Sequence, residues 1–106
     1  MKKPRILAVD DDLFGLQILK NGLQDLGYEV VTCNSGYKAQ EILEKEGTVS
    51  FDCLVSDHHM PEMSGLELLK WLSEKDPNLA TIIVTAEHEK ELVQSSLRGG
   101  AVDFLE

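Results

Sequence analysis

The sequence contains little cysteine and no long apolar run, and both features narrow the class of protein. Of its 106 residues only Cys33 and Cys53 are cysteines, and their spacing fits neither a metal site nor a redox motif. We expect both thiols to be reduced, without a disulfide. No apolar stretch approaches the roughly 20 residues of a membrane span, and no signal-peptide pattern follows the basic start. The sequence therefore predicts a cytoplasmic protein without a membrane segment.

Positive charge is also scarce in this chain. Ten Lys and Arg residues stand against 19 Asp and Glu residues, which gives a net charge of −9 at pH 7. Such a chain repels nucleic-acid phosphates, so we do not expect this domain to bind DNA or RNA directly. Hydrophobic residues make up 42% of the chain, enough for one packed core and too many for a disordered acidic tail. The excess of acid suits a solvated surface or a cation site.

Short apolar runs alternate with amphipathic segments, and no linker or repeat interrupts them. The expected strands are 5–9, 28–33, 51–56, 80–84 and 101–105, and the expected helices are 13–26, 36–46, 65–74 and 87–98. The partial alternation of 28–33 suits an edge strand. This order predicts an α/β fold, a doubly wound parallel sheet covered on both faces. Such sheets bind ligands beyond the carboxyl ends of their strands, at the switch point in strand order.

Polar residues follow three of the expected strands. Asp10, Asp11 and Asp12 follow the first strand, Asp57 follows the third, and Thr85 follows the fourth. A single aspartate after a strand is also explained as a turn former or a helix N-cap. If the first and third strands are neighbours, however, these carboxylates converge, and Mg²⁺ would relieve their repulsion. A carboxylate beside Mg²⁺ with a hydroxyl nearby can act as a nucleophile on phosphorus.

Four segments of the sequence carry a resemblance to a known family. The segments ILAVDDD, LVSDHHMPEMSGLELL, IIVTA and GGAVDFL resemble the receiver domain of two-component response regulators, which is CheY-like. The resemblance covers essentially the whole chain, 1–106. It implies a flavodoxin-like five-stranded parallel sheet with strand order 2-1-3-4-5. It also implies a phosphorylation-dependent signalling switch, which is not an enzyme beyond catalysing its own phosphoryl transfer and dephosphorylation.

The resemblance assigns roles to the residues at the strand ends. Asp57 would be the phosphoacceptor, served by a sensor histidine kinase, a phosphotransfer protein or a small donor such as acetyl phosphate. Asp11 would bind Mg²⁺ directly and Asp10 would bind it through water. The backbone carbonyl of His59 would be the third protein ligand. Thr85 would bond a phosphoryl oxygen and couple it to the conformational switch.

Other residues would take part in the conformational switch or tune how long the phosphoryl group survives. Phe104 lies where the family places the aromatic residue that turns inward on activation, and the face of helix four and strand five would then change. The same face is the family's usual dimerisation surface, so a homodimer is one expected assembly. His59 and Glu87 either tune dephosphorylation or are simple solvated residues. Adjacent histidines in a loop rarely aim both rings at one metal ion, so we do not expect His58 and His59 to form a transition-metal site, and we expect His58 to be a loop residue.

The end of the chain departs from the family pattern. The family places a lysine directly after the stretch that ends here at Glu106, and a fifth helix follows it. We therefore expect a C-terminally truncated receiver, apparently lacking the fifth helix, with any output domain outside this chain.

Two alternative functions remain open at this point. A phosphatase of the haloacid dehalogenase type would use Asp10 as nucleophile and Asp12 as acid, but it would leave the DHHMPEMSG block unexplained. A receiver-like interaction module that is never phosphorylated would not need the complete set of acidic residues.

Overall fold

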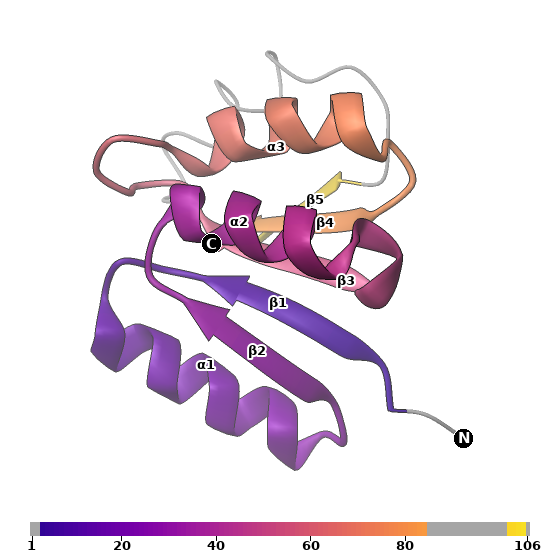
Figure 1. The fold of residues 1–106 in the computed structure, drawn as a ribbon. Coiled ribbons are helices and arrows are strands. Elements are labelled where there is room, and N and C mark those ends of the chain that lie inside the picture. Colours follow the sequence, from indigo (N-terminus) through magenta and orange to yellow (C-terminus); the bar gives the residue numbers. More distant parts are fainter. Residues whose placement is uncertain (1–2, 85–101, 106) are drawn as a thin grey trace.

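The computed structural model describes residues 3–84 and 102–105. In these parts strands and helices alternate along the chain (Figure 1). The strands are β1 (Arg5–Val9), β2 (Glu29–Cys33), β3 (Cys53–Asp57), β4 (Ala80–Val84) and β5 (Val102–Leu105). The helices are α1 (Leu13–Asp25), α2 (Gly36–Glu46), α3 (Gly65–Lys75) and the short 3₁₀ helix η1 (Thr48–Ser50). The helix expected over 87–98 lies outside the described residues.

All strand pairs are parallel, and the strand order is β2-β1-β3-β4-β5. The predicted parallel α/β sheet is confirmed, and β2 lies at its edge as expected. Helix α1 covers one face of the sheet, while α2 and α3 cover the other (Figure 1). Because β1 and β3 are neighbours, the residues that follow them meet at one edge of the sheet.

Two apolar clusters fill the space between the sheet and its helices. Central strands of a parallel sheet are buried on both faces, and β1 accordingly carries four buried residues in succession. The side chains of Leu7, Leu54 and Leu68 have no exposed surface. The cluster under α2 and α3 also contains Val9, Cys33, Ala39, Leu43, Phe51, Met60, Met63, Leu72 and Leu79. The cluster under α1 contains Ala8, Leu16 and Val30, with Leu19, Leu23 and Tyr28 packed against it.

The third strand begins and ends later than its apolar run indicated. The sequence predicted a strand over 51–56, but β3 spans Cys53–Asp57. Helix η1 precedes it and ends at Ser50, and the next residue, Phe51, has a buried side chain but lies outside the β3 ladder. At the other end Asp57 pairs with Val84 of β4, so its backbone is held in the sheet.

Local capping fixes where the helices begin and end. The Asp12 side chain accepts a hydrogen bond from the Phe14 backbone N–H at 3.1 Å and so starts α1. Gly27, predicted to end this helix, has a φ of 95°, which only glycine adopts readily. A capping box starts α3, with the side chains of Ser64 and Glu67 each accepting from the other's backbone N–H. No described helix is both long and apolar enough to cross a membrane.

Arg5 links several segments at the amino ends of the strands, a role that we did not predict from the sequence. The Arg5 guanidinium pairs with Glu29 of β2 and with Glu46 of α2, and it lies 4.7 Å from the centre of the Phe51 ring. Its backbone N–H donates to Asp52 at 2.8 Å. These contacts join β1, β2, α2 and the two residues that precede β3, at the amino ends of the strands. Because the pairs are partly exposed, we expect each to stabilise the fold only modestly.

Candidate functional site

Three carboxylates meet where β1 and β3 end. Asp10 and Asp11 follow β1 directly, and Asp57 is the last residue of β3. Each offers a carboxylate oxygen, and these oxygens all lie within 4.8 Å of one another. The predicted convergence of these three residues is therefore confirmed. An all-oxygen cluster of this size fits a hard divalent cation such as Mg²⁺.

Without a bound cation, the carboxylates of this cluster repel one another. Burial, together with the nearby charges of Asp10 and Asp11, raises the pKa of Asp57 to about 6, while His59 acts in the opposite direction. Burial also raises the pKa of Asp10 above its usual value, and the backbone N–H of Asp12, at 3.0 Å, partly offsets this. A bound cation would relieve the repulsion, which is a second reason to expect one here.

Asp12 has a separate, structural role. It is exposed, caps α1 through its side chain, and lies outside the three-carboxylate cluster. Its backbone N–H donates to Asp10 and so helps to orient that carboxylate. Asp12, expected either to face solvent or to cap the first helix, does both.

The start of α3 lies directly against the backbone of Asp57. The Gly65 N–H donates to the carbonyl of His58 at 3.0 Å. A Cβ atom on Gly65 would lie 2.6 Å from the Asp57 carbonyl oxygen and 3.0 Å from the His58 Cα. Only glycine permits this approach, so Gly65 sets the distance between the start of α3 and the end of β3.

Two methionines anchor the loop between β3 and α3. Met60 and Met63 are both buried in the cluster under α2 and α3, a role in the core that we did not predict from the sequence. The Met63 side chain packs against Gly36, where an added Cβ would come within 2.6 Å of the Met63 sulfur. Between them Glu62 has a left-handed φ of 69°. The loop is therefore fixed by packing at two points.

The adjacent histidines differ in their surroundings. The His58 backbone N–H donates to the Val84 carbonyl at 2.9 Å and extends the β3–β4 pairing by one residue. His58 lies in the loop, as predicted, but it is half-buried, and its Nδ1 has no hydrogen-bond partner among the described residues. His59 is exposed, and its ring centre lies 5.3 Å from that of His58. The predicted roles of the His59 carbonyl and side chain stay predictions.

Three predicted site residues are not placed at the cluster. Thr85 and Glu87 lie outside the described residues. Phe104 lies on β5, where its backbone pairs with Ile83, but its side chain lies outside the description. Their roles in switching and tuning stay predictions.

The response regulator receiver domain family matches residues 6–106, and the chain belongs to this family. Such a domain is a signalling module of two-component systems rather than an enzyme, which decides against the phosphatase alternative. The chain is 38% identical over 101 residues to the two-component response regulator ARR2 of Arabidopsis thaliana. It is 37% identical over 100 residues to the transcriptional regulatory protein ZraR of Klebsiella oxytoca. The two matches span 95% and 94% of the present chain, but only 15% of ARR2 and 22% of ZraR.

Solved receiver structures share the fold. A response regulator receiver domain protein from Clostridium thermocellum superimposes with a TM-score of 0.88 at 30% identity, over 96% of this chain and 80% of that one. The response regulator TrrA from Thermotoga maritima, solved in complex with Mg(2+)-BeF, gives a TM-score of 0.82 at 28% identity, over 97% and 86% of the two chains. The acidic cluster of the present chain is thus consistent with the phosphorylation and Mg²⁺ site typical of receivers.

Replacing Asp57 by asparagine should stabilise the metal-free protein at pH 8 and leave it unchanged at pH 4. The folded state raises the pKa of this carboxyl to about 6, so the charged form is disfavoured on folding. Its unfavourable contribution is small at pH 4, grows as the pH rises from about 4 to 6, and is complete above pH 6. We expect a gain of roughly 1 kcal/mol at pH 8, after allowing for solvent screening of this partly exposed group. Urea denaturation at both pH values measures it.

The control for this prediction is Asp52→Asn, which removes one exposed negative charge just before β3, away from the cluster. An equal gain at pH 8 in both variants would attribute the effect to net charge and would contradict the role of burial at Asp57.

Proposed function

We propose that this chain is a phosphorylation-dependent switch in which Asp57 accepts a phosphoryl group. The observation that carries the proposal is the meeting of Asp10, Asp11 and Asp57 within 4.8 Å at the carboxyl edge of a receiver sheet. The donor would be the phosphohistidine of a sensor histidine kinase or of a phosphotransfer protein. The domain would work in the cytoplasm, in a flavodoxin-like doubly wound fold.

The chemistry assigned to Asp57 is nucleophilic attack on phosphorus. A carboxyl oxygen forms a bond to phosphorus while the bond from phosphorus to the donor imidazole nitrogen breaks, which gives an acyl phosphate. A pKa of about 6 leaves this carboxyl mainly ionised, and therefore nucleophilic, at neutral pH. Its partial burial leaves it less solvated than an exposed aspartate, and pairing in β3 fixes its backbone.

The other two carboxylates would hold Mg²⁺. Asp11 would be a direct ligand, Asp10 would act through water, and the His59 carbonyl would complete the protein ligands. When bound, the ion supplies positive charge that offsets the negative charge of the phosphoryl oxygens. The hydrogen bond from Asp12 to Asp10 holds that side chain at the cluster.

The output would be a population shift in the C-terminal half of the domain. Thr85 would bond the phosphoryl group, Phe104 would turn inward, and the face of helix four and strand five would change. This face would contact an output domain outside the chain, a partner protein or a second copy. His59 and Glu87 would tune how long the phosphoryl group survives. The chain spans at most about a fifth of the two curated relatives named above.

Intact mass after incubation with Mg²⁺ and acetyl phosphate tests the proposal. We expect one phosphoryl adduct that requires Mg²⁺, is lost in Asp57→Asn and persists in Asp52→Asn, which removes the same charge at the other end of the strand. If there is no adduct, the experiment is repeated on a chain extended past position 107. Rescue there would show that residues beyond 106 are needed for the reaction, whereas a second failure would favour the interaction module that is never phosphorylated.

A further inference from the structure

Helix α1 contains two glycines, Gly15 in its first turn and Gly22 in its second half. Glycine is the poorest helix former after proline, so each of them costs stability relative to alanine. Neither has a φ in the left-handed region, where a glycine would be required. A Cβ atom on Gly22 would meet no atom within 4 Å, so its surroundings do not call for glycine either. Gly15 differs, because two carboxylates lie against it.

These carboxylates belong to Asp10 and Asp12. A Cβ atom at position 15 would lie 3.4 Å from Oδ2 of Asp10 and 3.3 Å from Oδ2 of Asp12. Both carboxylates are held through their other oxygen. Oδ1 of Asp10 accepts from the Asp12 backbone N–H at 3.0 Å, and Oδ1 of Asp12 accepts from the Phe14 backbone N–H at 3.1 Å. Neither carboxylate can therefore turn away from position 15 without weakening one of these hydrogen bonds.

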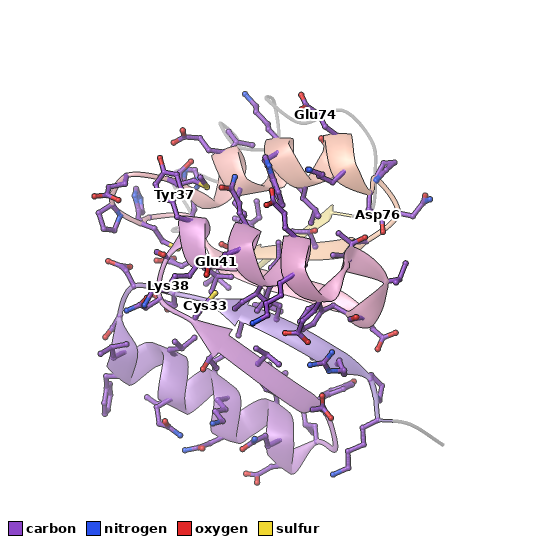
Figure 2. The ribbon with its side chains drawn as sticks, viewed as in Figure 1. Cys33, Tyr37, Lys38, Glu41, Glu74 and Asp76 are labelled. Carbon is purple, nitrogen blue, oxygen red and sulfur yellow. The ribbon has the colours of Figure 1, made fainter. Side chains whose placement is uncertain are left out.

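The two Oδ2 atoms are left for water or a cation. No residue that the structure describes donates a hydrogen bond to either atom, and the ion pairs among these residues include neither Asp10 nor Asp12. Lys38, which lies next to Glu41 and near Cys33 (Figure 2), is not part of those ion pairs either. An ionised carboxylate that is partly buried, as that of Asp10 is, needs such a partner. One approach to its Oδ2 atom is the space that a side chain at position 15 would fill.

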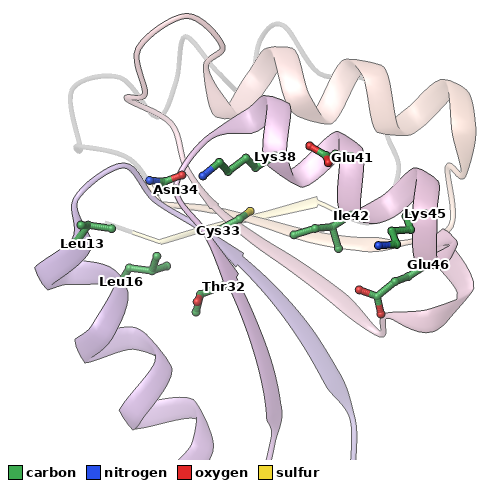
Figure 3. Close-up of a pocket in the computed structure, with 10 residues that line it drawn as sticks. All are labelled: Leu13, Leu16, Thr32, Cys33, Asn34, Lys38, Glu41, Ile42, Lys45 and Glu46. Carbon is green, nitrogen blue, oxygen red and sulfur yellow. The ribbon is translucent and has the colours of Figure 1, made fainter.

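A groove of about 760 Å³ between α1 and α2 does not provide this approach (Figure 3). Leu13 and Leu16 line the groove from α1, but Gly15, Asp10 and Asp12 are not among its lining residues. The approach to the Asp10 carboxylate past α1 therefore depends on position 15 and not on the groove.

A side chain at position 15 would remove water from the Oδ2 atom of Asp10. A methyl group at 3.4 Å cannot donate a hydrogen bond, and it takes the place of a water molecule that could. Mg²⁺ keeps several of its waters when it binds to proteins, so a carboxylate that reaches the ion through water is sensitive to such a loss.

We propose that Gly15 is a positioning residue of the cation site and acts by keeping the Oδ2 atom of Asp10 hydrated. Because it lacks a side chain, Gly15 leaves room for the water through which Asp10 holds Mg²⁺. The inference rests on the function proposed above, in which Asp10 binds the ion through water. It gives a functional reason for a glycine that the helix itself does not require.

Substitutions at positions 15 and 22, followed by isothermal titration calorimetry with Mg²⁺ at pH 8, test this inference. Gly15→Val should weaken binding at least about tenfold, as the loss of a supporting group at a metal site does. Gly22→Val, the same change on the same helix, should alter the affinity by at most about twofold. Gly15→Ala should weaken binding less than Gly15→Val, and it is compared with Gly22→Ala if the valine variant does not fold.

Gly15→Thr separates the loss of water from a displacement of the helix. Threonine has the shape of valine, but its hydroxyl can donate a hydrogen bond to the Asp10 carboxylate or to a water beside it. We expect Gly15→Thr to bind Mg²⁺ at least about threefold more tightly than Gly15→Val, because a hydrogen bond to a charged group is restored. Equal losses in these two variants would show a steric effect and would overturn the inference.

Double-mutant cycles identify the carboxylate through which Gly15 acts. In the Asp10→Asn background, Gly15→Val should cause a further loss of at most about twofold, because the group it affects has been removed. In the Asp12→Asn background it should keep its full effect. The reverse pattern would assign the effect to the helix cap and would contradict the role of Asp10.

Titration of the unmodified chain separates failure of this inference from failure of the proposed function. If the unmodified chain binds Mg²⁺ and Gly15→Val binds it equally well, the inference is wrong and the cation site stands. If the unmodified chain binds no Mg²⁺ at millimolar concentrations, the cation site is itself wrong and the inference is overturned with it.

Discussion

Gly65→Ala is expected to lower the free energy of unfolding by about 2–3 kcal/mol, as overpacking in a rigid environment does. The added methyl group would lie 2.6 Å from the Asp57 carbonyl oxygen and 3.0 Å from the His58 Cα. Both are backbone atoms of the residues where β3 ends, so neither can move without disturbing the sheet. The higher helix propensity of alanine returns at most about 1 kcal/mol. Urea denaturation followed by the fluorescence of Trp71 measures the difference.

Two other glycines provide matched controls for this substitution. A Cβ on Gly22, within α1, would meet no atom within 4 Å, so Gly22→Ala should stabilise the protein by about 0.5–1 kcal/mol. A Cβ on Gly36 would meet the flexible side chain of Met63, so Gly36→Ala should give an intermediate result. If Gly65→Ala stabilised the protein as much as Gly22→Ala, the inferred close contact between the start of α3 and the end of β3 would be contradicted.

The same substitution should also affect the proposed chemistry. Moving the Asp57 backbone displaces its carboxylate relative to Asp10 and Asp11, so Gly65→Ala should form less phosphoryl adduct under conditions where it remains folded. Gly22→Ala should form as much adduct as the unmodified chain.

Asp11→Asn is expected to weaken Mg²⁺ binding by at least about tenfold, the lower end of what the loss of a supporting metal-site group costs. It removes an anionic oxygen from a cluster whose three carboxylates lie within 4.8 Å of one another. Asp10→Asn should have an effect of the same sign. Isothermal titration calorimetry at pH 8 measures the affinity directly.

Asp12→Asn is the matched control for the metal site. It removes the same charge one residue further on, keeps an oxygen that can cap α1, and lies outside the cluster. We expect only a small change in Mg²⁺ affinity. Equal losses in Asp11→Asn and Asp12→Asn would mean that general negative charge, rather than this cluster, attracts the cation.

Substitutions that weaken Mg²⁺ binding at this cluster should stabilise the metal-free protein. Without a cation Asp10 and Asp57 have raised pKa values because both are partly buried beside other carboxylates. Asp10→Asn should therefore stabilise the metal-free protein while it weakens metal binding. Opposite signs in these two measurements are typical of a site that is built for function at some cost in stability.

Much of the fold and of the candidate site could be predicted because the signals are local. The apolar run of β1, the capping box of Ser64 and Glu67, and the glycines that end α1 and α2 act within a few residues. The same is true of the position of Asp10 and Asp11 directly after a buried strand. The predicted start of β3 was wrong because the apolar run beginning at Phe51 does not reveal that the Phe51 backbone N–H bonds back to Thr48 of η1, so that the β3 ladder begins only at Cys53.

The sequence by itself therefore determined the order of the elements and which residues stand at the strand ends, since short-range periodicity and capping encode both. Only the tertiary structure decided that β1 lies beside β3, which brings Asp10 and Asp11 to Asp57 and raises the pKa of that carboxyl to about 6. It also decided the contact of Gly65 with the acceptor strand. These features depend on the packing of segments far apart in the sequence, and burial and proximity of charge exist only once those segments have packed.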